Sequence, residues 1–111
     1  MQPNSVVHAT ELTLAHEPVP ADQRVEGTPA TGLSVVGDFG GLEVGVWEMT
    51  PGVMRDEEAD EVFVVLSGAA IVEFDDGAPR LRLGPGDVVR LAAGARTTWT
   101  VTETLRKVYL S

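Results

Sequence analysis

The sequence contains no cysteine and only two histidines among its 111 residues. The lack of cysteine excludes a disulfide framework, a thiolate metal site and a cysteine nucleophile. No apolar run approaches the roughly 20 residues that a membrane-spanning helix needs. The N-terminus also lacks a basic region followed by an apolar core, the pattern that marks a secretory signal. We therefore expect a cytoplasmic protein that has no membrane partner.

Basic residues are scarce too, since eight lysines and arginines stand against 17 aspartates and glutamates, for a formal net charge of −9. This excess of negative charge repels a phosphate backbone, so we expect no nucleic-acid partner. The charge is unevenly spread, because residues 1–79 hold 15 acidic and 2 basic residues, whereas residues 80–111 hold 2 acidic and 6 basic ones. We expect these two segments to lie against each other and to stabilise the domain by charge pairing.

Helix signals are nearly absent, and the length fits one domain. Asp76-Gly77 lies between two apolar runs and predicts a β-hairpin, because both central positions of such a turn need φ > 0. The predicted strands are Leu33–Val36, Leu42–Met49, Glu61–Ser67, Ala69–Phe74, Arg80–Leu83, Val88–Leu91, Thr97–Val101 and Leu105–Leu110. About eight short strands with frequent turns indicate an all-β domain, either a sandwich or a barrel.

The first 31 residues differ from the remainder, because several turn residues interrupt any regular pattern, namely Pro18, Pro20, Gly27 and Pro29. Leu12 and Leu14 alternate with polar neighbours, which predicts one short strand there. We expect residues 1–31 to form an irregular N-terminal arm and residues 32–111 to form the barrel. The arm cannot form a compact unit alone, so we predict that it packs on its own barrel or on a neighbour's, giving a homodimer.

Several motifs resemble those of one protein family when they are taken in order. They are Val46-Trp47-Glu48-Met49-Thr50-Pro51-Gly52, Glu61 seven positions before Gly68, Gly84-Pro85-Gly86-Asp87, Ala93-Gly94 and Thr98-Trp99. This series is similar to small single-domain cupins of the branch named after the ureidoglycine aminohydrolase cupin domain, over residues 24–111. The resemblance implies a single antiparallel jelly-roll β-barrel whose open mouth holds a metal or a small ligand.

The histidines that hold the metal in cupins are missing from their expected positions. The resemblance carries over one ligand, Glu61. The imidazole positions fall on other residues, namely Arg55 and Glu57, or Met54 and Asp56, and on Thr97. Only His8 and His16 are present, both in the arm, where we expect surface residues without a metal role. We therefore predict no tightly bound transition metal and no cofactor.

Five acidic residues lie within six positions, and their oxygens are ligands that hard cations accept. They are Asp56, Glu57, Glu58, Asp60 and Glu61. If a divalent metal such as Mn²⁺ binds, we expect Asp56, Glu57 and Glu61 to hold it. The favoured interpretation is a solvated acidic loop. Glu61 is the exception, because it begins an apolar strand. It either contacts a ligand or forms a buried ion pair with Arg55 or Arg96.

Strand periodicity places further candidates on the interior face. Thr97 and Trp99 share one face of a predicted strand, and the cupin register makes Thr97 a neighbour of Glu61. Aromatic side chains near a barrel mouth offer a surface for planar or sugar-like ligands, although core filling is the more frequent role. Lys107 shares a face with Tyr109, and we expect it to be a surface lysine. The predicted ligand-binding residues are Glu61, Thr97, Trp99, Arg55, Trp47 and Tyr109.

The sequence has no nucleophile elbow, no phosphate-binding loop and no Ser/His/Asp set, so nucleophilic hydrolysis has no support in it. We therefore expect a cupin-type small-molecule-binding protein that lacks the usual histidine metal site. The alternative is a ureidoglycine aminohydrolase-like enzyme that acts on a small polar nitrogenous or sugar-like substrate, for which a metal such as Mn²⁺ is implied. A third alternative is a purely structural dimer partner.

Overall fold

The computed structural model describes all 111 residues and contains nine strands and no helix. The strands are β1 (Glu17–Pro18), β2 (Arg24–Glu26), β3 (Ala30–Phe39), β4 (Leu42–Met49), β5 (Gly52–Glu57), β6 (Glu61–Phe74), β7 (Leu81–Leu83), β8 (Val88–Leu91) and β9 (Arg96–Leu110). No helix is available that could cross a membrane. The all-β prediction is therefore confirmed.

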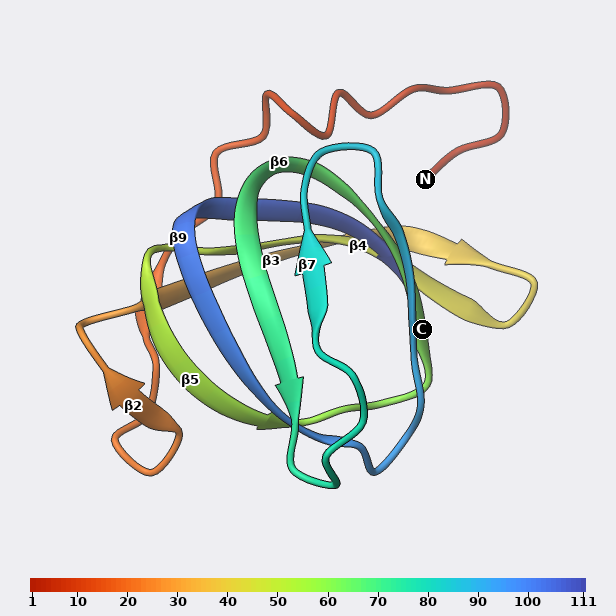
Figure 1. The fold of residues 1–111 in the computed structure, drawn as a ribbon. Helices are drawn as coiled ribbons and strands as arrows, with labels where there is room; N and C mark the ends of the chain where they lie inside the picture. Colours follow the sequence, from red (N-terminus) through yellow and green to blue (C-terminus); the bar gives the residue numbers. More distant parts are fainter.

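The long strand β9 organises the barrel, because it has partners along both of its edges. One edge pairs with β6 along nearly its whole length. The other edge pairs with β5 over residues 96–101 and with β4 over residues 105–110. All pairs are antiparallel, and the sheet curls on itself into a jelly-roll barrel (Figure 1). This curvature brings the ends of β4, β6 and β9 together at one mouth of the barrel.

Two pairs of predicted strands are continuous in the structure. Residues 61–67 and 69–74 form the single strand β6, and residues 97–101 and 105–110 form β9. The strands bend where their register shifts, between Val65 and Ala70. Gly68 has φ +93° there, and a Cβ on it would lie 2.1 Å from the carbonyl oxygen of Thr104. A glycine at this corner lets the two backbones approach closely. The prediction that the strand ends at Gly68 is therefore wrong.

Strand β5 was not predicted, since residues 52–57 have the composition of a turn followed by an acidic loop. It forms because all six of its residues pair with the first half of β9, from Gly52 opposite Val101 to Glu57 opposite Arg96. This pairing carries the first part of the acidic run onto the sheet. The strand therefore brings acidic side chains to the barrel mouth that we expected in a loop.

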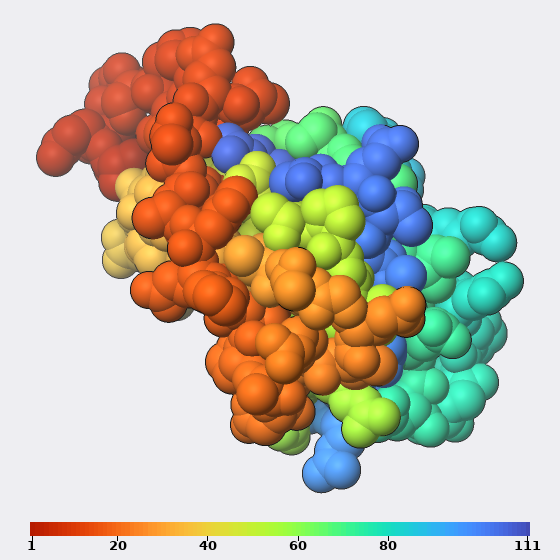
Figure 2. Space-filling view, turned by 90° about the vertical axis from the view of Figure 1, so that its left-hand side faces the viewer, coloured from red at the N-terminus to blue at the C-terminus, as the bar shows by residue number.

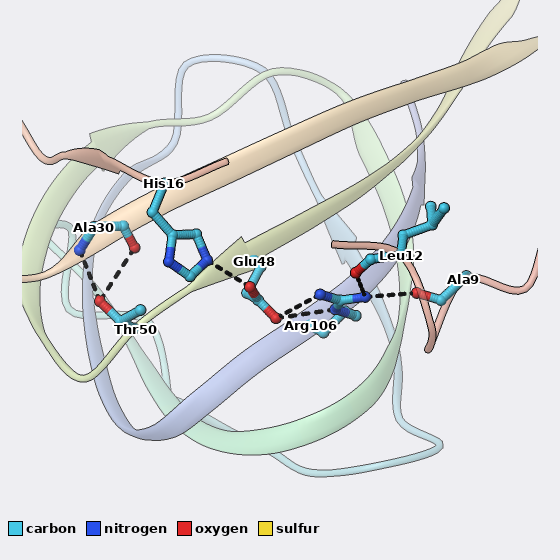
Figure 3. A network of polar contacts seen from close by, with 7 residues as sticks. All are labelled: Ala9, Leu12, His16, Ala30, Glu48, Thr50 and Arg106. Atoms are coloured by element: carbon cyan, nitrogen blue, oxygen red, sulfur yellow. Dashed lines mark hydrogen bonds and ion pairs between the residues drawn. The ribbon is translucent and has the colours of Figure 1, made fainter. Parts of the chain in front are cut away.

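The N-terminal arm follows one face of the barrel (Figure 2). Residues 12–14 form no strand, so that prediction is wrong; two short strands form instead at β1, which pairs with β3, and at β2, which pairs with β5. Two polar side chains, on Glu48 and Arg106, fasten the arm (Figure 3). Arg106 donates to the carbonyl oxygens of Ala9 and Leu12 at 2.9 and 2.6 Å, and His16 meets Glu48 at 2.5 Å.

The apolar core lies inside the barrel and ends at the mouth. Inward-facing residues alternate along β6, with Phe63, Val65, Ala70 and Val72 all buried, as strand periodicity requires. Further core residues come from five other strands and the arm: Val19, Met49, Met54, Leu83, Val89, Leu91, Trp99, Val101, Leu105 and Tyr109. Phe63 and Trp99 form the boundary between this core and the polar side chains of the mouth.

Candidate functional site

A cavity of about 270 Å³ opens at the barrel mouth. Its twelve lining residues include five carboxylates, one lysine and both tryptophans of the chain. They are Leu33, Glu43, Trp47, Asp56, Glu57, Glu58, Ala59, Glu61, Trp99, Lys107, Tyr109 and Ser111. Strands β3, β4, β5, β6 and β9 all contribute to this set. The cavity is therefore a product of barrel closure and not of any one loop.

Glu61 and Lys107 form a buried ion pair in this cavity. Lys107 Nζ lies 2.9 Å from Glu61 Oε1, and the two side chains are only 6% and 11% exposed, respectively. In the β6–β9 register Lys107 lies opposite Val65, so its side chain extends past Phe63 to reach Glu61. The predicted surface position of Lys107 is therefore wrong, and so is a pairing of Glu61 with an arginine. A lysine can lie inside because a carboxylate on the same face compensates its charge.

Three aromatic rings surround the same ammonium group. Lys107 Nζ lies 4.6, 4.2 and 5.1 Å from the ring centroids of Trp47, Phe63 and Trp99. The two indoles also meet edge to face, with centroids 5.6 Å apart. Cation–π attraction from these rings adds to the ion pair and stabilises a charge that has left water. We name these three rings and Glu61 the ammonium cage.

Glu58 is buried in the wall of the cavity, which corrects the expectation that the acidic run is simply solvated. Its Oε2 accepts hydrogen bonds from Thr97 Oγ1 at 2.6 Å and from Trp99 Nε1 at 2.9 Å. Thr97 therefore contacts Glu58, although the sequence suggested Glu61 as its neighbour. The sequence did not single out Glu58, yet Asp56 lies opposite Thr97 in the β5–β9 register. This register places Glu58, two residues after Asp56, beside the same part of β9.

Asp56 has a perturbed acidity. Burial, together with the neighbouring Glu58 and Glu61 carboxylates, raises the pKa of Asp56 to about 6, against the opposing effects of the Glu57 N–H and Lys107. Asp56 also lines two smaller hollows beside the main cavity. A carboxyl group that titrates near neutral pH is thus central to the mouth, where it can either attract a cation or transfer a proton.

Tyr109 closes the cavity from the β4 side. Its hydroxyl donates to Glu43 Oε2 at 2.7 Å, and burial together with this carboxylate raises the pKa of the phenol. Gly45 lies opposite Tyr109 in the β4–β9 register. A Cβ at position 45 would lie 2.4 Å from the Tyr109 hydroxyl oxygen, so only glycine leaves room for the ring.

The predicted ligand-binding residues fall into two groups. Glu61, Trp47, Trp99 and Tyr109 line the main cavity. Arg55 and Thr97 instead line an adjoining hollow of about 260 Å³, whose other residues are Gln23, Asp56, Glu57, Asp75 and Arg96. Arg55 is exposed on the outer side of β5 and forms no ion pair with Glu61.

A metal centre of the cupin type does not fit these residues. No three side chains among the histidines, aspartates and glutamates come together as metal ligands. Glu61 is paired with Lys107, and Glu58 accepts two hydrogen bonds from Thr97 and Trp99. Asp56, Glu57 and Glu61 do line one cavity, but they do not form such a group.

Comparisons with known proteins place this barrel in a family. The family model that matches residues 36–109 is described as a EutQ-like cupin domain. The EutQ protein of Clostridium difficile has a similar structure, with a TM-score of 0.71 and 14% identity over 95% of this chain and 83% of that one. A Rhizobium leguminosarum protein of unknown function gives a TM-score of 0.64 and 25% identity over 72% of this chain and 78% of that one.

A third similar structure is a Pseudomonas syringae protein of unknown function, with a TM-score of 0.75 and 25% identity over 90% of this chain. The chain spans less than half of that protein, 44% of its length. No curated protein sequence matches significantly. The finer resemblance to the ureidoglycine aminohydrolase branch stays a prediction. The matched residues cover most of the sequence, including all of β4, β5 and β6 and nearly all of β9, and the chain belongs to the EutQ-like cupin domain family.

Proposed function

We propose that the chain is a small-molecule-binding cupin domain whose ligand is a small, polar, nitrogen-containing compound. The observation that carries this proposal is the lining of the mouth cavity, where five carboxylates and one ammonium group lie beside two indole rings. Carboxylates accept hydrogen bonds from N–H groups and attract cations, and indole faces bind cations and sugar rings. An anionic ligand would be repelled by this lining.

The volume of the cavity limits the ligand's size. About 270 Å³ corresponds to roughly nine water molecules, at about 30 Å³ of liquid volume each. The enclosed part of the site therefore suits a group of about the size of a single sugar ring or a short amine. Trp47 offers it a partly exposed aromatic face, and exposed Glu43 and Glu57 flank the entrance.

We further propose that this binding requires no transition metal. Imidazoles are the ligands that suit such metals, and the cavity contains none. Elemental analysis of the tag-free protein should give far less than one equivalent of Mn, Fe, Ni or Zn per chain, and EDTA should leave ligand binding unchanged. About one equivalent of any of these metals would overturn this part of the proposal.

Tryptophan fluorescence tests the binding directly, because both tryptophans line the cavity. Titration with small alkylammonium ions, amino amides and monosaccharides at pH 7.5 should give a saturable change for the nitrogen-containing compounds. Asp56→Asn should weaken binding of the cations about tenfold, whereas Glu73→Gln, at an exposed site on β6, should not alter it. If no compound in this panel gives saturation in fluorescence or calorimetry, the proposed function is wrong.

A second candidate function is a ureidoglycine aminohydrolase-like enzyme acting on a small polar nitrogenous or sugar-like substrate. Asp56 favours it, because a carboxyl pKa of about 6 suits general acid–base catalysis at neutral pH. Ammonia release from small ureido and amino compounds, with and without added Mn²⁺, measures this activity. Release that Asp56→Asn abolishes would favour the enzyme, and binding without turnover would favour the binding protein.

A further inference from the structure

The charges of the cavity are arranged by depth. Lys107 is its only cationic residue and is 6% exposed, so it lies at the floor together with Glu61. Glu43 and Glu57 are exposed and lie at the rim, with half-buried Asp56 between rim and floor. A ligand that enters thus meets carboxylates first and an ammonium group last. This order gives the site a direction along which a polar ligand must align.

The ammonium group of Lys107 retains unused hydrogen-bonding capacity. An ammonium group has three N–H donors, and Glu61 is the only oxygen partner that the protein gives it. The three aromatic rings of the cage offer π faces but no lone-pair acceptor. Because Lys107 lines the cavity, an acceptor oxygen of a bound ligand is the group that would complete its donors.

The carboxylates around Lys107 determine which kind of ligand oxygen can accept its hydrogen bond. Glu61 already balances the charge of Lys107, and the buried Glu58 carboxylate lies against Trp99, which belongs to the same cage. A carboxylate or phosphate on the ligand would therefore be repelled by two anions at the floor. A neutral carbonyl or hydroxyl oxygen accepts a hydrogen bond from Lys107 without that repulsion.

We infer that Lys107 is the specificity-determining residue of the site, and that the ligand combines a neutral acceptor oxygen, held by Lys107, with a cationic nitrogen held by the carboxylates toward the rim. This inference rests on the proposed function and narrows it to small amino amides and amino sugars. Simple amines lack the oxygen, and amino acids carry a carboxylate where a neutral group is required. The chain's own lysine thereby supplies a fixed positive charge at the floor of the cavity.

Matched probes separate these classes. Glycinamide has the cation and the neutral oxygen, ethylammonium lacks the oxygen, acetamide lacks the cation, and glycine carries the oxyanion. Calorimetry should show glycinamide binding at least tenfold more tightly than each of the other three. In the double variant Glu61→Gln/Lys107→Met, which leaves no unpaired charge, glycinamide and ethylammonium should bind equally. Glu73→Gln is the control and should retain the wild-type preference.

The Lys107 side chain can also be observed in the wild-type protein. Its ¹⁵Nζ signal in an NMR spectrum should shift when glycinamide binds and stay in place with ethylammonium, so the inference does not depend on a variant that folds. If glycinamide and ethylammonium bind equally well to the wild type, or if glycinamide leaves the ¹⁵Nζ signal of Lys107 in place, the inference fails and the proposed function stands. If none of the probes, nor any compound of the wider panel, saturates the cavity, the proposed function fails, and the inference fails with it.

Discussion

Glu61→Gln tests the ion pair at the centre of the site. The substitution keeps the side chain's shape but leaves the ammonium group of Lys107 without a counter-charge, and both side chains are nearly inaccessible to water. Breaking a buried pair by removing one partner typically costs about 3–5 kcal/mol. The aromatic cage and the new amide oxygen still contact the ammonium group, so we expect the lower end, about 3 kcal/mol. In a domain of this size that lowers Tm by about 13 °C.

The double variant separates charge from packing. Glu61→Gln/Lys107→Met removes the orphaned charge and places a flexible thioether among three aromatic rings, an environment that methionine suits. Replacing both members of a buried pair is often close to neutral. We therefore expect the double variant to lie within about 1 kcal/mol of the wild type. The two single substitutions should then be strongly non-additive.

Urea unfolding followed by tryptophan fluorescence and by far-UV circular dichroism measures these free energies. Glu73→Gln is the matched control, because it removes the same charge from an exposed position on the same strand. Its effect should stay within about 0.5 kcal/mol. The reasoning is refuted if Glu61→Gln costs less than about 1 kcal/mol, or if the double variant loses the full sum of the two single losses.

Three other predictions concern the rest of the molecule. Because the pKa of Asp56 is raised, its neutral form stabilises the fold fully below pH 3.8, and this contribution is lost as the pH rises through about 6. Asp56→Asn should therefore raise the free energy of unfolding at pH 7.5 by about 1 kcal/mol after solvent screening. Urea titrations from pH 3.5 to 8 should show a flatter dependence of stability on pH for this variant than for the wild type. Arg106→Gln should release the arm, so limited proteolysis should cut residues 1–16 faster than in an Arg82→Gln control. We also propose that the outer edge of β3 beyond its pairing with β1, together with the exposed Phe39 at the end of this strand, forms a homodimer contact. Sedimentation should give a dimer mass that Phe39→Asp reduces, and a wild-type monomer at tens of micromolar would contradict this.

Local turn chemistry was enough to predict the fold class. Asp76-Gly77 does connect β6 to β7, and residues 42–49 and 88–91 form strands with the predicted bounds. The continuity of β6 was not predictable, because Gly68 looks like a turn residue when its φ and its close contact with β9 are unknown. Likewise β5 has no strong strand pattern of its own. It is a strand because β9 and β2 pair with it.

The site was accessible from sequence only where period two decides which way a side chain faces. Glu61 and Trp99 could be placed in the mouth because the cupin resemblance supplies a register, and period two then decides which face of its strand each residue occupies. Glu58 follows a strand end, where periodicity gives no direction. Its burial depends on Thr97 and Trp99, about 40 residues later in the chain. Such a pairing depends on the β5–β9 register, which the sequence does not display.

The burial of Lys107 was not predicted for a different reason, and the same reason explains how the site forms. Leu105, Arg106 and Lys107 are consecutive and all buried, because the arm covers the outer face of β9 while the barrel covers the inner face. Each charge therefore needs a carboxylate on its own side: Glu48 for Arg106 and Glu61 for Lys107. Every lysine or arginine ion pair in the structure joins residues 80–111 to residues 1–79. The uneven charge of the sequence is thus used on both faces of one strand, to fasten the arm on the outside and to fix an ammonium group inside.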